Sequence, residues 1–258
     1  MKVVKIGGAQ VDTPVMSHVW AFIRNAHEEG EEMVVVHGGG PQTTKLAQQL
    51  GHTSEIIQGR RVTTDLDLKI IQWVIRGELN ARLSAQAVVA GVRAVGISGI
   101  DDGLVEVIKR PLWNVDGRSV DFGWVGDVQK VNPELLFALI NAGFIPVVAT
   151  MGVDKNGQIY NVNGDTVSLE IAKTVGATEI VMVTESGGLR KDLNDPSTHC
   201  SVCDTALLET GRQAGWIQGG MLVKLEEAQK ALRAGIKSVL LIKAEDLAHP
   251  EKGTKVTV

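Results

Sequence analysis

Five short segments of the sequence carry residue types that suit the binding of anions. The first, Lys5-Ile6-Gly7-Gly8, and the second, His37-Gly38-Gly39-Gly40-Pro41, each follow a run of β-branched residues. Successive glycines leave backbone N–H groups uncovered, and a helix that begins behind them adds the positive end of its dipole. A plain turn would not require three glycines, because each costs conformational entropy. These segments indicate phosphate binding, although neither contains the P-loop or the dinucleotide-binding fingerprint.

The other three segments add charged and amide side chains. Gly59-Arg60-Arg61-Val62-Thr63 offers guanidinium groups, which can hold a carboxylate through two parallel hydrogen bonds. Asn161-Val162-Asn163-Gly164-Asp165 gathers more short polar side chains before a helix than an N-cap alone needs. Gly219-Gly220-Met221-Leu222-Val223-Lys224 places a lysine in the first turn of a helix, where it opposes the helix dipole and so requires an anionic partner. Surface arginines and N-caps are common, so only the combination indicates a site.

Short β-branched runs alternate with amphipathic stretches along most of the chain, and these elements must position the five segments. Buried strands are expected at residues 3–6, 33–36, 94–97, 146–149, 179–183 and 238–242. Helices are expected at residues 14–29, 41–51, 66–90, 132–143, 165–175, 204–213 and 220–235. The alternation predicts an α/β fold with a mainly parallel central sheet between two helical layers, a three-layer αβα sandwich. Ligands of such sheets bind beyond the carboxyl ends of the strands, where these segments lie.

The segment that follows the third strand interrupts this alternation. An Asp116-Gly117 turn is expected to join residues 104–109 to residues 119–126 as a hairpin on the surface. Trp113 and Trp124 are expected to pack this hairpin onto the sheet, and the alternative is that they cap a pocket.

Length and composition restrict the class of protein. The chain has 258 residues, of which 44% are apolar and 22% charged, as in folded domains. Its net charge of −4 argues against a partner such as nucleic acid or an anionic membrane surface. The sequence has no apolar run long enough for a membrane span and no signal-peptide pattern. Cys200 and Cys203 are the two cysteines, too few for a disulfide framework or a zinc site. A cytoplasmic protein is therefore expected.

Taken together and in this order, the five segments resemble the amino acid kinase family. The resemblance covers essentially the whole chain and ends with Gly253-Thr254. It implies the amino acid kinase (carbamate kinase-like) fold, with an N-terminal lobe at residues 1–178 and a C-terminal lobe at residues 179–258. The first lobe would bind the amino acid and mediate dimerisation, and the second would bind the nucleotide. The arginine and asparagine segments are similar to those of members that phosphorylate the side-chain carboxylate of an acylated acidic amino acid.

The resemblance implies transfer of the γ-phosphoryl group of ATP to the γ-carboxylate of N-acetyl-L-glutamate, which gives an acyl phosphate in arginine biosynthesis. Lys5 and Lys224 would stabilise the transferred group, and Asp165 would hold both lysines. Mg²⁺ would be bound by the phosphates of ATP and not by protein side chains. This chemistry needs no general base, because a carboxylate with a pKa near 4.3 is already ionised at neutral pH. It needs neutralisation of negative charge, which lysines and backbone N–H groups supply.

Motif matching also assigns the residues that would bind the two substrates. The phosphate- and nucleotide-binding residues would be Gly7, Gly8, Gly38, Thr184, Glu185, Gly219, Gly220 and Met221. The residues around the amino acid would be Gly39, Gly40, Arg61, Asn161 and Asn163, and the N–H group of Gly39 would also reach a phosphate. Glu185 stands where the family usually carries an aspartate, which leaves the nucleotide preference open.

Two further expectations follow from the resemblance. A similar kinase of lysine biosynthesis acts on aminoadipate or glutamate attached to a small acidic carrier protein, and Lys109-Arg110 is a small basic candidate for contact with such a carrier. The chain begins shortly before Lys5, without the additional N-terminal helix that joins arginine-inhibited members into hexamers. A homodimer without arginine feedback is therefore expected.

Overall fold

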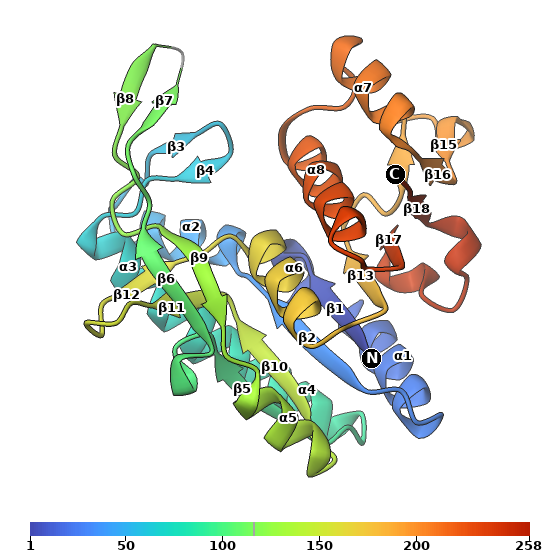
Figure 1. Ribbon diagram of the computed structural model, residues 1–258, viewed down its shortest axis with the longest axis horizontal. Helices are drawn as coiled ribbons and strands as arrows, with labels where there is room; N and C mark the ends of the chain where they lie inside the picture. Colours follow the sequence, from blue (N-terminus) through green and yellow to red (C-terminus); the bar gives the residue numbers. More distant parts are fainter. Residues whose placement is uncertain (116) are drawn as a thin grey trace.

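An eight-stranded sheet forms the centre of the computed structural model, which describes residues 1–115 and 117–258 (Figure 1). In order across the sheet its strands are β16 (Val202–Cys203), β18 (Thr254–Val256), β17 (Ser238–Ile242), β13 (Glu179–Val183), β1 (Lys2–Ile6), β2 (Met33–His37), β10 (Ile145–Ala149) and β5 (Ala94–Ser98). All neighbours pair in parallel except β17 and β18, which are antiparallel. All six predicted strands are present to within one residue.

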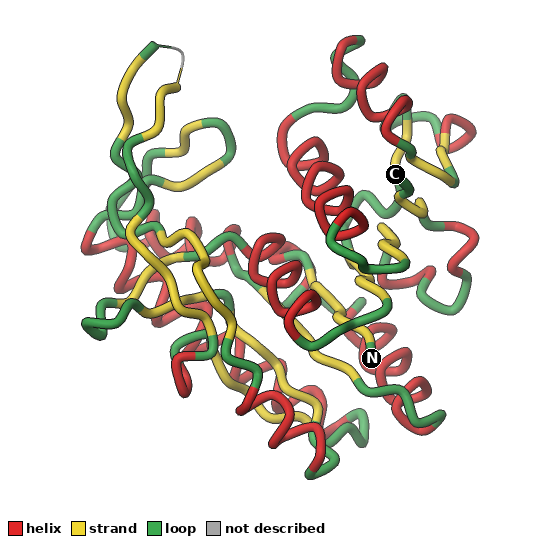
Figure 2. The backbone as a smooth tube through the Cα atoms, viewed as in Figure 1, coloured by secondary structure: helices red, strands yellow, loops and turns green. Residues whose placement is uncertain are grey.

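Helices cover both faces of this sheet, as Figure 2 shows. One face carries α1 (Met16–Glu28), α2 (Gly40–Gln49), α3 (Asp65–Ile71) and α4 (Asn80–Val89). The other carries α5 (Glu134–Asn141), α6 (Gly164–Thr174), α7 (Thr205–Gln213) and α8 (Gly219–Arg233). Side chains of a strand alternate between the faces, so Val3 joins the core under α6 and Val4 joins the core under α1. The predicted three-layer sandwich with a mainly parallel sheet is confirmed.

The helix predicted at residues 66–90 has the expected extent but not the expected geometry. Its middle part, η2 (Gln72–Leu79), is a π-helix between α3 and α4. Hydrophobic periodicity could not indicate this, because the apolar stripe continues through all three parts. Short 3₁₀ turns join other elements, and these are η1 (Gly8–Gln10), η3 (Asp101–Gly103), η4 (Pro196–Thr198), η5 (Ala244–Asp246) and η6 (Pro250–Lys252).

The prediction of one surface hairpin was wrong in its pairing. A second sheet contains β12 (Ile159–Asn161), β11 (Met151–Val153), β6 (Val105–Lys109) and β9 (Gly126–Val131), in that order. Thus β6 pairs with β9, and of the predicted partner segment 119–126 only Gly126 lies opposite β6, because Val105 and Val107 join a buried core. The smaller hairpins are β3 (Ile56–Ile57) with β4 (Arg60–Arg61), β7 (Trp113–Val115) with β8 (Arg118–Val120), and β14 (Leu189–Arg190) with β15 (His199–Cys200).

The two tryptophans of this region have different surroundings. Trp124 packs edge-on against Tyr160 of β12, with 5.9 Å between ring centroids, as predicted for a residue that attaches the hairpin. Trp113 packs against Phe122 and also borders a cavity, so both expectations describe it in part. Of the expected Asp116-Gly117 turn, the aspartate lies outside the described residues.

The sheet continues across the proposed lobe boundary near residue 178, because β13 lies directly beside β1. The division into two lobes therefore stays a prediction. No helix in the described part of the chain is both long and apolar enough to cross a membrane.

Candidate active site

The register of the sheet brings the glycine segments together at one edge. Ile6 at the end of β1 lies opposite His37 of β2 on one side and Val183 of β13 on the other. The chain therefore leaves all three strands at the same level, at residues 7, 38 and 184. This is the carboxyl edge of a parallel sheet, and β1 is the point from which later strands are added on opposite sides.

The two glycine segments are in direct contact at this edge. A Cβ atom at Gly8 would lie 3.1 Å from the backbone nitrogen of Gly40 and 3.2 Å from that of Gly39. The N–H groups of Gly8, Gly38 and Gly39 have no acceptor within the described part of the chain. They form a set of free donors at the start of α2, which suits a phosphate group.

The assignment of Gly7 needs correction. Its N–H group donates a 2.9 Å hydrogen bond to the carbonyl oxygen of Val183, which continues the ladder between β1 and β13. That donor is therefore not free for a phosphate oxygen. Gly7 remains necessary for space, because a Cβ atom there would lie 3.1 Å from the same carbonyl oxygen.

Asp165 joins the two predicted lysines, as the resemblance implied. Its Oδ1 lies 2.7 Å from Lys5 Nζ, and its Oδ2 lies 3.1 Å from Lys224 Nζ. Strand alternation points Lys5 toward the face that carries α6 and α8, while Asp165 lies in the first turn of α6 and Lys224 in the second turn of α8. Three distant parts of the chain therefore form one ionic cluster.

Burial and charge together set the protonation of this cluster. Burial alone would raise the pKa of Asp165, but the charges of Lys5 and Lys224 outweigh it and lower that pKa to about 2. Burial lowers the pKa of Lys5 from its usual value, and the charge of Asp165 opposes the shift. Asp165 is thus fully ionised at neutral pH, which is the state that can hold two ammonium groups.

Local structure at the start of α6 explains the polar segment before it. Asn163 is the N-cap: its Oδ1 accepts from the N–H groups of Asp165 at 2.8 Å and Thr166 at 3.1 Å. The oxygen of Asn163 is therefore used structurally, and only its amide NH₂ group remains for the ligand assigned to it. Gly164 passes close to the lysine, since a Cβ atom there would lie 3.7 Å from Lys5 Cε.

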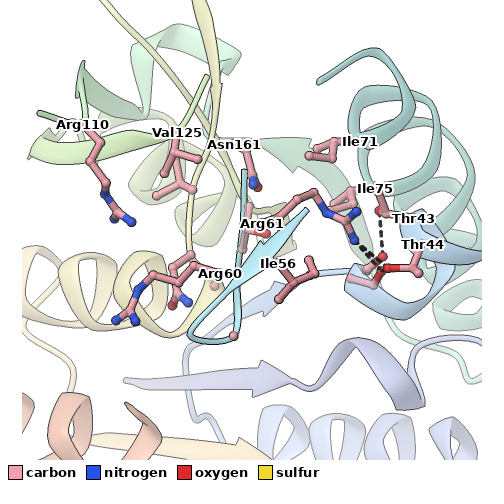
Figure 3. Close-up of a pocket in the computed structure, with 18 residues that line it drawn as sticks. Thr43, Thr44, Ile56, Arg60, Arg61, Ile71, Ile75, Arg110, Val125 and Asn161 are labelled. Atoms are coloured by element: carbon pink, nitrogen blue, oxygen red, sulfur yellow. Dashed lines mark hydrogen bonds between the residues drawn. The ribbon is translucent and has the colours of Figure 1, made fainter. Parts of the chain in front are cut away.

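Beside this cluster is a cavity of roughly 340 Å³, which we call the arginine cavity. It is bordered by residues 38–40, by Arg60, Arg61 and Arg110, and by Asn161 and Asn163 (Figure 3). No aspartate or glutamate among the described residues lines it. An excess of fixed positive charge without carboxylates suits an anionic small molecule.

Arg61 is held firmly at the wall of the arginine cavity. Its Nη2 donates to Thr44 Oγ1 at 2.6 Å, and its Nη1 lies 3.7 Å from Asp67 Oδ1. Figure 3 shows the side chain extending toward Thr44. The side chain is 10% exposed, and burial lowers the pKa of its guanidinium despite the nearby Asp67. A charged group fixed in this way is ready to receive a carboxylate.

Asp67 is a residue that the sequence reasoning missed. It is 1% exposed and accepts hydrogen bonds from Ser54 and from the backbone and hydroxyl of Thr64, while His52 Nε2 lies 3.1 Å away. Burial would raise the pKa of Asp67, but these donors lower it below its usual value. The signal was present, because Thr64 and Asp67 form a capping box at the start of α3.

Two more predicted or conspicuous side chains are explained by their partners. Asn161 borders the arginine cavity and donates to Thr63 Oγ1 at 3.1 Å, so its carbonyl oxygen remains available. His37 is buried between Gly38 O and Asn80 Nδ2, at 3.0 and 2.9 Å from its two ring nitrogens. Burial lowers the pKa of His37 to about 4, so the ring is neutral and structural.

The residues assigned to the nucleotide are divided between two places. Gly219 and Gly220 lie with Lys224 and Asp165 around a small cavity of roughly 130 Å³, which we call the lysine cavity. Gly219 has a φ of 56°, a conformation that favours glycine. The other three do not line the described cavities: Thr184 donates to Gly187 O, Glu185 is exposed, and Met221 packs against the core. Their nucleotide contacts stay predictions.

Two comparisons with known sequences bear on identity. A sequence model of the amino acid kinase family matches residues 1–242. The chain belongs to the amino acid kinase family. Curated relatives include an acetylglutamate kinase of Methanopyrus kandleri, which is 36% identical over 96% of each chain. Another acetylglutamate kinase, from Parabacteroides distasonis, is 39% identical over 86% of each chain.

Solved structures agree with membership of the amino acid kinase family at the level of the fold. A Neisseria gonorrhoeae N-acetylglutamate synthase superposes with a TM-score of 0.84 at 21% identity, over 100% of this chain and 59% of that one. A carbamate kinase of Giardia superposes with a TM-score of 0.66 at 13% identity, over 99% and 98%. The predicted family and carbamate kinase-like fold are thereby confirmed. The predicted activity agrees with the names of the relatives, which do not favour the carrier-protein alternative.

Proposed function

We propose that this protein is an acetylglutamate kinase, which transfers the γ-phosphoryl group of ATP to the γ-carboxylate of N-acetyl-L-glutamate. The observation that carries the proposal is the fixed guanidinium of Arg61 in a cavity without acidic side chains, directly beside the cluster of Lys5, Asp165 and Lys224. The first group suits the acidic amino acid, and the second suits the phosphoryl group. The names of the curated relatives support the same reaction.

The proposed reaction needs no proton transfer by the protein. The attacking carboxylate is ionised at neutral pH and becomes an acyl phosphate without losing a proton. His37 is unsuited to act as a base, because it is buried and Asn80 occupies its Nε2. The protein therefore contributes position and charge compensation, which are the main needs of phosphoryl transfer.

Each part of the site has a role in this proposal. The free N–H groups of Gly8, Gly38 and Gly39 bind phosphate oxygens as the chain leaves β1 and β2. Lys5 on β1 and Lys224 on α8 approach the transferred group from different parts of the fold. Their shared contact with Asp165 fixes the distance between the two ammonium groups. Negative charge that develops on the phosphoryl oxygens then meets two positioned ammonium groups.

Mg²⁺ is proposed to enter the site together with ATP. Both oxygens of Asp165 are occupied by lysines, and the described residues contain no cluster of three metal-ligating side chains. Because Asp165 is paired with both lysines, this arrangement suits a metal ion that is held by the phosphates of the nucleotide and not by the protein. The bound ion would supply additional positive charge to the phosphates.

The remaining expectations belong to the same proposal. The segment after residue 178 would carry the nucleotide, with Thr184, Glu185 and Met221 near it, and the protein would act as a cytoplasmic homodimer. Val88 and Val89 on α4 are exposed, which supports association of two copies. Sedimentation velocity tests this expectation, since a single species with the mass of one chain would contradict it.

Trapping of the acyl phosphate as a hydroxamate tests the proposed reaction. The assay contains ATP, Mg²⁺ and N-acetyl-L-glutamate, with glutamate and N-acetyl-aminoadipate as parallel acceptors. Rapid product formation with N-acetyl-L-glutamate alone is the expected result. Absence of product with all three acceptors, when ATP still binds, would contradict the proposal and favour a carrier-linked substrate.

A further inference from the structure

Arg60 is positioned by a tight turn, and its side chain points in another direction than that of its neighbour Arg61. Gln58 and Gly59 connect β3 to β4 and have φ values of 46° and 75°. Positive φ at both residues is typical of the tight turns in two-residue β-hairpins. Consecutive residues of a strand point to opposite faces, so Arg60 extends away from Thr44 while Arg61 extends toward it (Figure 3). The guanidinium of Arg60 lies 5.0 Å from the centre of the Trp113 ring.

Arg60 borders three cavities of the molecule. It lines the arginine cavity and the lysine cavity described above. It also lines an outer cavity of roughly 370 Å³ between Trp113, α6 and α8. Arg60 therefore lies where the space for the amino acid meets the space around Lys224 and Asp165. A group passing between two substrates bound in these spaces would pass this side chain.

Within residues 1–115 and 117–258, no carboxylate lies within ion-pair distance of Arg60. The other cationic side chains that line the three cavities all have a carboxylate within ion-pair distance, namely Arg61–Asp67 at 3.7 Å, Arg110–Asp127 at 2.7 Å, Lys173–Glu170 at 2.8 Å, Lys224–Asp165 at 3.1 Å and Lys230–Glu227 at 2.6 Å. For Arg60 the described residues provide no such partner. Arg60 is half-buried, and its guanidinium lies over the face of Trp113.

The net positive charge of the cluster of Lys5, Asp165 and Lys224 is small compared with the negative charge of the two substrates that it is proposed to bind. Two lysines and one ionised aspartate carry a net charge of +1. The donor phosphates and the acceptor carboxylate are both anionic, and charge accumulates on the oxygens of the phosphoryl group during transfer. A second uncompensated cation at the meeting point of the cavities would double the local positive charge.

We propose that Arg60 is a further catalytic residue, which contacts the phosphoryl group as it passes from the nucleotide to the carboxylate. In this step the bond between the γ-phosphorus and its bridging oxygen breaks, and the electron pair leaves with ADP. A bond forms between the same phosphorus and an oxygen of the γ-carboxylate, and no proton moves. This inference rests on the proposed function and adds Arg60 to the residues that stabilise its transition state.

Steady-state kinetics of Arg60→Leu test the assignment. We expect kcat to fall by a factor of roughly 10 to 100, because one positioned donor to the transferred group is lost. The KM values for N-acetyl-L-glutamate and ATP should stay within about twofold, which is typical of an interaction made mainly in the transition state. Arg60→Lys should restore part of kcat, since it keeps the charge but loses the planar group.

A second measurement separates catalysis from folding. Arg60→Leu should weaken binding of MgADP with tetrafluoroaluminate in the presence of N-acetyl-L-glutamate, and should leave the affinity for MgATP alone almost unchanged. Arg118→Leu is the matched control, because this exposed arginine on β8 removes the same charge from outside the cavities. It should keep the kinetic constants and melting temperature of the wild type.

The possible results distinguish this inference from the function on which it rests. An inactive wild type with N-acetyl-L-glutamate would overturn the proposed function and the role of Arg60 together. An active wild type and an Arg60→Leu variant with unchanged kcat would overturn only the role of Arg60. A rise in KM of tenfold or more at unchanged kcat would also overturn it, because Arg60 would then bind the amino acid in its ground state.

Discussion

Replacement of Asp165 by asparagine should both inactivate and destabilise the protein. The amide has almost the same shape but no charge, so two ammonium groups lose their common partner. The side chain of Lys5 is 8% exposed and that of Lys224 is 23% exposed, so Lys5 loses most by the change. Removal of one partner from a buried ion pair typically costs about 3–5 kcal/mol. Because Lys224 can reach water, we expect about 3 kcal/mol at neutral pH.

Urea unfolding of the wild type and Asp165→Asn measures this cost. With a dependence of about 3 kcal/mol per molar urea for a chain of this size, the midpoint should fall by roughly 1 M. Glu251→Gln is the control, because this carboxylate is exposed and its loss should change the free energy of unfolding by less than about 0.5 kcal/mol. A loss of less than about 1 kcal/mol for Asp165→Asn would refute the description of the cluster as a buried and tightly coupled set.

The pH dependence provides an independent check of the same reasoning. The pKa of Asp165 is lowered to about 2 from an ordinary value of 3.8, so its ionisation contributes stability that is present above pH 4 and is lost as the pH falls toward 2. This contribution is about 2 kcal/mol. The Asp165→Asn variant lacks it at every pH, because an asparagine side chain does not ionise. The difference in free energy of unfolding between the wild type and Asp165→Asn should therefore become smaller below pH 4. An equal difference at pH 3 and pH 7 would contradict the assignment.

Three other substitutions test separate parts of the site. Lys224→Ala should lower kcat by a factor of roughly 100 or more in the hydroxamate assay, with little change in the KM for ATP. Arg61→Ala should raise the KM for N-acetyl-L-glutamate by a factor of roughly 10 to 100, and an unchanged KM would show that Arg61 does not bind this substrate. Gly39→Ala should lower the free energy of unfolding by about 1–3 kcal/mol, because its Cβ atom would lie 2.4 Å from Leu79 Cδ1. Gly40→Ala is the control in thermal unfolding, since a Cβ atom at Gly40 would meet nothing within 4 Å.

Sequence patterns were sufficient to predict six strands of the eight-stranded sheet, and the family resemblance implied the ionic cluster. Continuous β-branched runs place the six predicted strands, because a strand buried on both faces is mainly apolar and lacks regular polar alternation. Lys224 was expected in the first turn of its helix and lies in the second turn of α8, and the anionic partner that its position called for is Asp165. The position of Lys224 indicated the need for an anionic partner, and the family resemblance indicated that Asp165 is this partner.

Other features depended on contacts that no local pattern records. The pairing of β6 with β9 is determined by a shared core, and both strands are too short for their alternation to select a partner. The N–H group of Gly7 was assigned to phosphate, although the ladder with β13 uses it, since register is a property of two segments and not of one. For Asp67, the capping box with Thr64 was a local signal, but its 3.7 Å contact with Arg61 was not recorded by that pattern.

The placement of β1 in the interior of the sheet has a consequence for how the enzyme is made. Lys5 is translated before its neighbour β13 and before its ionic partners on α6 and α8, which lie much later in the chain. At 5–20 residues per second, the roughly 220 residues between Lys5 and Lys224 take about 10 to 40 s to synthesise. During that interval an apolar strand has an open edge and a lysine has no counter-charge. This order of strands therefore lets β1 pair early with β2, while the side of β1 that receives β13 stays open until residues 179–183 have been made.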